Sequence, residues 1–213
     1  KLKYDISLAH CNFMLRGKES NKDEIFVKEL GERLQVPTYT IRFDTETFAS
    51  KYGISTQMAA RDLRYNWFNQ LTEENDIAYI LTAHQKDDVI ETFLINLTRG
   101  TGLDGLTGIP EVNGNIVRPM LHFTRNEILI FATKHKLQWR EDSSNSSIKY
   151  VRNKVRHKVV PFLKELNPNL LETFSHTLEN LKGSQQIVKD CILNLKEKTI
   201  SIHGSAIHLD IEE

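Results

Sequence analysis

The first 136 residues alternate short apolar runs with longer amphipathic stretches, and this alternation limits the folds open to the chain. The run at residues 77–82, IAYILT, is apolar almost throughout, as is typical of a central parallel strand covered on both faces. Other strand-like runs lie at residues 6–10, 37–43 and 116–121, and helical patterns lie at residues 21–34, 56–71, 87–98 and 124–136. Strands alternating with helices of this length predict an α/β fold with a doubly wound parallel sheet.

Capping residues mark two of these helices. Ser55 precedes the helix at residues 56–71, and Thr124 with Glu127 forms a capping-box pattern at the helix of residues 124–136. On the helix at residues 21–34, four apolar residues are expected on the inner side: Ile25, Phe26, Leu30 and Leu34.

The character of the chain changes after residue 143, where a polar loop leads into a mainly helical segment. We therefore predict an α/β domain over residues 1–148 and a helical extension over residues 149–198. Apolar and polar residues alternate from residue 199, so residues 199–213 are expected to begin a following domain. The sequence lacks an initiator Met, and both of its ends look like cuts within a longer protein.

Charge and composition narrow the function classes. The 28 basic and 28 acidic residues give a formal charge of zero, so any contact with RNA must come from a local patch. No apolar run approaches the ~20 residues that span a bilayer, and no secretory segment opens the sequence, which predicts a cytoplasmic protein without a membrane partner. Cys11 and Cys191 are isolated and make neither a disulfide framework nor a CxxC site.

The first candidate site lies where the strand at residues 77–82 passes into a helix. At ~100° per residue, four polar side chains project from one side of that helix: His84, Asp87, Asp88 and Glu91. Ile90, Phe93 and Leu97 belong to the apolar side opposite. Ligands of open α/β sheets bind at the carboxyl ends of the strands, and like charges at this spacing repel one another. The cluster therefore predicts a bound cation, metal or amine-bearing substrate.

Two other readings of this segment remain open. Acidic residues also favour the first turn of a solvated helix. A metal phosphohydrolase would use a His-x-x-Asp-Asp pattern, but it needs further His and Asp ligands that are not recognisable nearby, so we predict no metal site of this kind.

Basic residues mark two further candidate segments. Arg61 and Arg64 share one side of the helix at residues 56–71 and could hold phosphate or carboxylate, although a surface ion pair with Asp62 is the alternative. Residues 149–158 contain five basic residues, one His and no acid, with Arg152 and Arg156 one turn apart. This run predicts phosphate or RNA binding, with a solvated face as the alternative.

A short glycine-rich stretch follows the acidic helix. Gly100 and Gly102 belong to the sequence RGTG at residues 99–102. The pattern is a weak signal for nucleotide binding because many helix C-caps look the same.

Taken in order, the segments resemble the tRNA(Ile)-lysidine synthetases, which are N-type ATP pyrophosphatases or PP-loop enzymes. The resemblance runs from about residue 5 to residue 170 and rests on AHCNFMLR at residues 9–16, AARDLRY at 59–65, AHQKDDVIET at 83–92, RGTGL at 99–103, RPML at 118–121, EDSSN at 141–145 and RNKVR at 152–156. It implies an adenine nucleotide alpha hydrolase-like, Rossmann-like fold with a helical C-terminal extension.

The resemblance also implies a reaction. ATP would adenylate the C2 oxygen of the wobble cytidine in tRNA(Ile), and the side-chain amine of free L-lysine would then displace AMP to form lysidine. The implied cofactors are ATP and Mg²⁺, the implied partners are tRNA(Ile) and L-lysine, and a homodimer is an open alternative to a monomer.

Roles for individual residues follow from the same resemblance. The catalytic candidates are Asp88, Arg61 and Arg152. The candidates for binding the substrate lysine are Asp88, Glu91, Asp87 and His84. The candidates for binding ATP are Ala9, His10, Asn12, Arg64, Gly100 and Gly102. The candidates for binding tRNA are Arg152, Asn153 and Arg156.

The sequence departs from the family pattern in two places. The signature Ser-Gly-Gly-x-Asp-Ser loop does not occur in it and is expected before residue 1, so the chain alone is expected to be inactive or poorly active. Phe13 stands where the family commonly has His, which weakens a catalytic role for that position.

Two rival functions stay open. A PP-loop tRNA thiolase would need reactive cysteines or an iron–sulfur site, and only Cys11 and Cys191 are present. A non-catalytic RNA-binding fragment would use the basic run without ATP or lysine.

Overall fold

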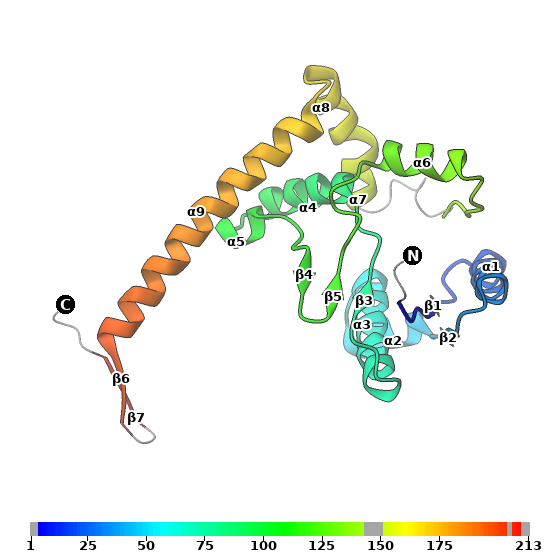
Figure 1. The fold of residues 1–213 in the computed structure, drawn as a ribbon, viewed down its shortest axis with the longest axis horizontal. Coiled ribbons are helices and arrows are strands. Elements are labelled where there is room, and N and C mark those ends of the chain that lie inside the picture. The colour runs from blue at the N-terminus through cyan, green and yellow to red at the C-terminus, as the bar shows by residue number, and fades with distance from the viewer. Residues whose placement is uncertain (1–3, 143–150, 204–205, 210–213) are drawn as a thin grey trace. The chain divides into compact units, whose positions relative to one another are not determined.

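The computed structural model describes residues 4–142, 151–203 and 206–209 of the chain (Figure 1). The chain divides into two compact units, Lys1–Ile80 and Leu81–Glu213. Each unit is described by itself below.

The first unit is built on a parallel strand pair. β1 (Leu8–Asn12) lies beside β2 (Thr38–Arg42), and α1 (Lys18–Leu34) connects them. Gly31 of α1 packs so closely on β2 that an added Cβ would lie 1.8 Å from Oγ1 of Thr38. A residue without a side chain is therefore required where this helix meets the sheet. The observed pair confirms the predicted β–α–β order, with the first strand shifted by two residues.

The inner side of α1 is polar. Its buried residues are Ser20, Glu24 and Gly31, whereas Ile25 and Leu34 are 54% and 55% exposed. The prediction that Ile25 and Leu34 face inward is wrong. The helix is held by hydrogen bonds from neighbouring strands to buried Glu24, a partner that apolar periodicity cannot reveal.

Two helices follow β2 in the first unit. α2 (Thr45–Tyr52), which the pattern analysis missed, begins where the Asp44 carboxylate accepts a hydrogen bond from the backbone N–H of Thr47 at 3.1 Å. α3 (Thr56–Glu74) confirms the second predicted helix, and Ser55 caps it through the N–H of Met58. Trp67 and Leu71 lie among its buried residues.

The second unit begins with a small sheet of order β3-β5-β4. β3 (Ile80–Leu81) lies at the unit boundary, and β4 (Val112–Asn113) and β5 (Ile116–Val117) form an antiparallel hairpin. The backbone N–H of Thr82 donates to the carbonyl of Val117 at 3.0 Å, which carries the pairing beyond β3.

The predicted strands at residues 77–82 and 116–121 are wrong in length. Tyr79 and Leu81 are 64% and 65% exposed, so in the described structure this segment is not covered on both faces. The second strand ends because residues 118–121 turn, with the N–H of Leu121 donating to the carbonyl of Arg118, and because Pro119 has no N–H to donate.

The core of the second unit lies between α4 (Lys86–Arg99) and the C-terminal helices. Val89 and Ile90 of α4 pack with Phe174 and Leu178 of α9 (Leu170–Thr199), so the helical extension packs on α4. Leu97 is 53% exposed, so its predicted inward position is wrong. The inward positions predicted for Ile90 and Phe93 are confirmed, and Leu94 and Ile95 also pack against this core.

The remaining elements connect these helices. α5 (Leu103–Leu106) and α6 (Arg125–Lys134) follow α4, and the capping box of Thr124 and Glu127 at α6 is confirmed. α7 (Val151–Lys154), the π-helical turn η2 (Val155–Val159) and α8 (Val160–Leu166) form a short continuous helical segment before α9. The chain then enters an antiparallel hairpin of β6 (Ile200–His203) and β7 (Ala206–Leu209), so the predicted strand character after residue 199 is confirmed (Figure 1).

The domain limits predicted at residues 148 and 198 stay predictions. Among the described residues, no helix is both long and apolar enough to cross a bilayer.

Candidate active site

Three carboxylates at the start of α4 form a buried group, which we call the acidic cluster (Asp87, Asp88 and Glu91). The side chain of Glu91 is 2% exposed, and those of Asp87 and Asp88 are 16% and 15% exposed. The reading of this segment as a solvated helix start is therefore wrong, because charged groups in such positions require partners.

Those partners come from the helical extension of the same chain. Nε of Arg156 lies 2.6 Å from Oε1 of Glu91, and its Nη2 lies 2.9 Å from Oε2 of Glu91 and 3.1 Å from Oδ1 of Asp88. Nε of Arg152 lies 3.3 Å from Oε2 of Glu91, and its Nη2 donates to Oγ1 of Thr92 at 2.6 Å. The acidic cluster thus meets cations, as predicted, but the cations belong to the protein.

Asp87 has a different set of partners from its two neighbours. Its Oδ1 lies 3.1 Å from Nζ of Lys164 on α8, and its Oδ2 accepts the backbone N–H of Arg125 at 2.8 Å. Asp87 therefore joins α4 to the first turn of α6 and to α8. This arrangement gives Asp87 a structural task that its neighbours do not share.

Burial and hydrogen bonding oppose each other at Glu91. Burial raises the pKa of the Glu91 carboxyl, while the hydrogen bonds and charge of Arg156 lower it. The bidentate contact with Arg156 is strong only while Glu91 is ionised, since a guanidinium donates and a carboxylate accepts. Loss of Arg156 from this position would therefore leave a buried group that favours protonation or another cation.

The other predicted members of this site lie close by in the sequence. His84 precedes α4, and its Nδ1 lies 3.0 Å from Oγ1 of Thr82. Asn153 is buried on α7. Of the predicted RNA-binding residues, Arg152 and Arg156 turn toward α4, so the reading of this pair as a solvated face is wrong. Residues 149 and 150 of the basic run lie outside the described residues.

Sequence reasoning missed Lys164 as a member of this network. The spacing from Arg156 to Lys164 is eight residues, close to two helical turns, so helical periodicity is the signal that could have found it. Arg118 was also missed as a buried group: it is 5% exposed and donates from Nη1 to the carbonyl of Pro110 at 2.8 Å.

In the first unit, successive side chains of β1 point to opposite sides of the strand, so the predicted nucleotide-binding residues do not all lie on one side. Asn12 is buried toward α1, where its Nδ2 donates to Oε2 of Glu24 at 2.8 Å and to Oδ1 of Asn21 at 3.0 Å. His10 points to the same side, and burial lowers its pKa. Its Nε2 is buried and has no hydrogen-bond partner within the part of the chain that the structure describes. Ala9 is exposed.

Two arginines of α3 lie over aromatic rings, and one of them, Arg64, lies beside the segment that contains β1. The guanidinium carbon of Arg64 lies 5.2 Å from the ring centroid of Phe13, and that of Arg61 lies 4.8 Å from the ring of Tyr65. Burial raises the pKa of the Cys11 thiol to about 11, while nearby Arg64 lowers it. Arg64 thus lies with Cys11 and Phe13, whereas Asn12 is used within the protein.

The glycine-rich stretch adopts helix-boundary conformations. Gly100 follows α4 with a φ of +72°, and Gly102 is the N-cap of α5. The C-cap reading of Gly100 is confirmed. A role of either glycine in ATP binding stays a prediction.

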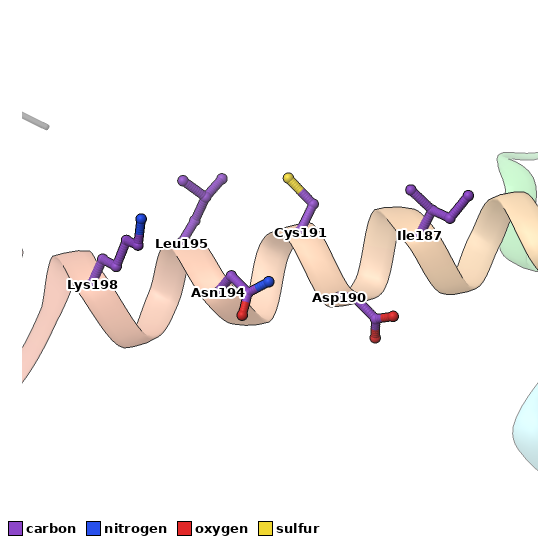
Figure 2. Close-up of a pocket in the computed structure, with 6 residues that line it drawn as sticks. All are labelled: Ile187, Asp190, Cys191, Asn194, Leu195 and Lys198. Atoms are coloured by element: carbon purple, nitrogen blue, oxygen red, sulfur yellow. The ribbon is translucent and has the colours of Figure 1, made fainter.

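A pocket outside these groups lies along α9. Figure 2 shows its lining residues on one helix: Ile187, Asp190, Cys191, Asn194, Leu195 and Lys198. It contains none of the residues predicted for catalysis or binding. Among the described residues, no group of three or more His, Cys, Asp or Glu side chains is arranged to hold a metal ion.

The fold can be compared with that of a solved protein. The structure superposes on the U34-tRNA thiolase NcsA from Methanococcus maripaludis, which holds a [4Fe-4S] cluster, with a TM-score of 0.62 and 15% sequence identity. The likeness covers 83% of this chain and 61% of that one, and at this identity it shows the fold alone. The class is an α/β protein with the adenine nucleotide alpha hydrolase-like fold, as the sequence predicted.

The family follows from the sequence. Residues 1–163 match the model of the PP-loop domain, and the chain belongs to that family. A PP-loop domain implies use of ATP. The match gives no support to the prediction that the phosphate-binding loop lies before residue 1.

Individual relatives agree with one another in name. The chain is 50% identical over 184 residues to the tRNA(Ile)-lysidine synthase of Porphyromonas gingivalis, covering 86% of this chain and 40% of that protein. It is 40% identical over 210 residues to the enzyme of the same name from Bacteroides thetaiotaomicron, covering 99% and 49%. It is 34% identical over 213 residues to the tRNA(Ile)-lysidine synthase of Caldanaerobacter subterraneus, covering 100% of this chain and 46% of that protein. The chain spans less than half the length of each of these relatives.

Proposed function

We propose that the chain is the PP-loop part of a tRNA(Ile)-lysidine synthase. In this function the C2 oxygen of the wobble cytidine of tRNA(Ile) attacks the α-phosphorus of ATP and pyrophosphate leaves. The amine of free lysine then attacks C2 and displaces AMP. The relatives of that name and the family match support the proposal. The structural observation that carries it is the acidic cluster, which is buried beside two arginines at the start of α4.

The acidic cluster supplies the lysine site of this proposal. An alkyl ammonium needs carboxylate partners once it leaves water, and Asp88 and Glu91 lie near enough to share one cation, since Arg156 already bridges them. Asp88 is the more exposed of the two and could accept a proton from the attacking amine. The contacts of Asp87 with Lys164 and Arg125 favour a supporting role for that residue.

The first unit supplies groups for the nucleotide. Arg61 and Arg64 would stabilise charge that develops on phosphate during adenylyl transfer. The Nε2 of His10, which has no hydrogen-bond partner among the described residues, and the exposed residue Ala9 fit a bound base or ribose, while Asn12 would act only through the position of β1. ATP supplies the electrophilic phosphorus and the AMP leaving group.

Mg²⁺ fits the described residues poorly. The carboxylates of the acidic cluster are taken by Arg152, Arg156 and Lys164, and oxygen ligands are what this ion requires. None of the steps assigned to these residues therefore involves the metal.

The test is formation of lysidine by the full-length protein. Asp88→Ala and Arg152→Ala should each reduce turnover at least about 100-fold, measured by mass spectrometry of the digested tRNA, because each removes a charged group of the reacting site. Glu73→Ala and Lys134→Ala are matched controls for the charge changes, since both residues are exposed. Near-normal turnover of the Asp88 and Arg152 variants rejects the assignment.

The rival functions are separated by binding. Isothermal titration with ATP, L-lysine and tRNA should give heat for all three ligands, and binding of tRNA alone would support a non-catalytic RNA binder. The thiolase alternative is disfavoured by chemistry, because the chain has two cysteines and burial raises the pKa of one of them, Cys11, to about 11.

A further inference from the structure

The carboxylates that would receive the substrate amine are already occupied. Both oxygens of Glu91 accept from Arg156, one oxygen of Asp88 contacts Arg156, and the other accepts the backbone N–H of Gln85 at 3.0 Å. Each carboxylate oxygen of the pair therefore has a hydrogen-bond donor. An ammonium group cannot bind both carboxylates at full strength while the Arg156 guanidinium stays between them.

We propose that Arg156 is an internal placeholder, which an incoming alkyl ammonium displaces from Asp88 and Glu91. The inference rests on the proposed lysine site and names how entry to that site is controlled. The exchange is one of cations, so it leaves the charge of the buried carboxylates compensated at its beginning and at its end. Without Arg156 or a substitute cation, Asp88 would lose the cation that contacts it and Glu91 would keep only Arg152, which is costly for carboxylates with so little exposure.

The backbone around Arg156 suits such an exchange. Arg156 lies in η2, a π-helical turn, and single π-turns are rare segments that strain a helix by one extra residue. A change of the Arg156 side-chain rotamer moves the guanidinium away from the carboxylates and keeps the register of the flanking helices. The arginine can then leave Glu91 without unfolding of the segment.

The flanks of the turn are held independently of Arg156. On the N-terminal side, Arg152 donates to Thr92 at 2.6 Å. On the C-terminal side, Val160 is buried in the core and Lys164 contacts Asp87 at 3.1 Å. Displacement of the Arg156 side chain therefore leaves α7, α8 and the core residue Val155 of η2 docked on α4.

The placeholder makes a prediction that a purely structural ion pair does not. A ligand that binds only the open form of a protein has an apparent Kd equal to its intrinsic Kd divided by the fraction of open molecules. Here the closed form is the one in which Arg156 contacts Asp88 and Glu91. Removing the placeholder removes that loss. Arg156→Gln should therefore bind L-lysine more tightly than the wild type, whereas loss of a supporting arginine would weaken binding.

The experiment is a calorimetric titration of L-lysine into the full-length wild type, Arg156→Gln and Lys158→Gln. Lys158 lies on the same turn, is exposed and undergoes the same change of charge, so its variant controls for net charge. We expect Arg156→Gln to lower the Kd at least threefold and Lys158→Gln to leave it within a factor of 1.5. If the wild type binds lysine and folded Arg156→Gln binds no more tightly, the exchange is wrong and the lysine site stands. If neither protein binds lysine, both the exchange and the proposed lysine site are wrong.

A second measurement covers the case in which Arg156→Gln does not fold, as judged by circular dichroism and thermal melting. Hydrogen exchange of the backbone amides at residues 151–159 is then followed in the wild type with and without L-lysine. Displacement of Arg156 should speed exchange in the η2 turn. Unchanged or slower exchange there overturns the placeholder.

Discussion

Asp87 accepts a hydrogen bond from the backbone N–H of Arg125 at 2.8 Å, although 38 positions separate the two residues. The contact gives the first turn of α6 a carboxylate that comes from α4. Because the first N–H groups of a helix lack partners within it, a carboxylate there acts as a cap. One side chain thus sets the position of α6 beside the acidic cluster.

We expect Asp87→Ala to lower the free energy of unfolding by about 1–3 kcal/mol, because it leaves a helix N–H and Lys164 without their acceptor. Asp87→Asn keeps one carbonyl oxygen for Arg125 and should cost roughly half as much. Urea unfolding of both variants measures the difference. Equal losses for the two variants would show that the α6 contact contributes nothing.

Gly108 provides a test of packing between α4 and α9. It has a φ of +80°, and an added Cβ would lie 2.8 Å from Cγ1 of Val89 and 3.6 Å from Cδ2 of Leu178. Gly108→Ala should therefore lower the unfolding free energy by about 2–4 kcal/mol, because it strains the backbone and displaces core side chains. The clash is with core side chains and cannot be relieved by a flexible chain end.

Gly114 is the matched control for that substitution. It has a φ of +60° in the β4–β5 hairpin, and nothing lies within 4 Å of an added Cβ. Gly114→Ala should lower the unfolding free energy by about 1 kcal/mol, because it strains the backbone without a steric clash. The interpretation fails if denaturant unfolding gives the same loss at both glycines.

Glu24 should make the stability of the first unit depend on acid. Its hydrogen bond with Arg42, followed by that with Lys28, lowers the pKa of Glu24 from 4.5 to about 2, and Asn12 adds to the effect. The folded-state pKa lies below the unfolded value, so the contribution is complete above about pH 4.5. It is lost as the pH falls toward 2.

Glu24→Gln removes this linkage. At pH 7 the variant should be less stable by about 1–3 kcal/mol, because a charged acceptor of three donors is lost. The difference in unfolding free energy between wild type and variant should become smaller as the pH of the measurement is lowered from 5 to 2. A gap that stays constant over that interval contradicts the assigned role.

The two cysteines should differ in reactivity. Cys11 is half-buried with a pKa of about 11, whereas Cys191 is exposed on α9. Because the thiolate is the nucleophile, Cys191 should react with a thiol-specific disulfide reagent at pH 8 at least about tenfold faster. Cys191→Ser should remove the fast phase and leave the slow one, and a surviving fast phase would show that Cys11 is accessible and ionised.

Local rules succeeded where an element depends on its own residues. The limits of α4 and the caps at Ser55 and Thr124 follow from neighbouring side chains, and each was predicted within a residue or two. α1 shows where such rules fail. Its buried side carries Glu24, whose partners Asn12 and Arg42 lie 12 and 18 positions away, so the apolar pattern indicated the wrong side.

At the candidate site, too, the sequence predicted the local features but not the contacts between distant segments. The pattern of Asp87, Asp88 and Glu91 predicted a cation, and the basic run at residues 149–158 predicted an anion. Neither pattern could reveal that Arg156 and Glu91 are partners, because 65 positions separate them. Their pairing requires α4 and the helical extension to pack together.

By itself, the sequence determined the places of the longer helices, the fold class and the kinds of charge at each segment, because these depend on periodicity and residue type within a few turns. The tertiary structure decided which charges meet and which strands are covered. Ion pairing and burial depend on distance in space, and Coulomb energy between Glu91 and Arg156 arises only after the apolar contacts of Ile90, Val155 and Phe174 have brought their helices together.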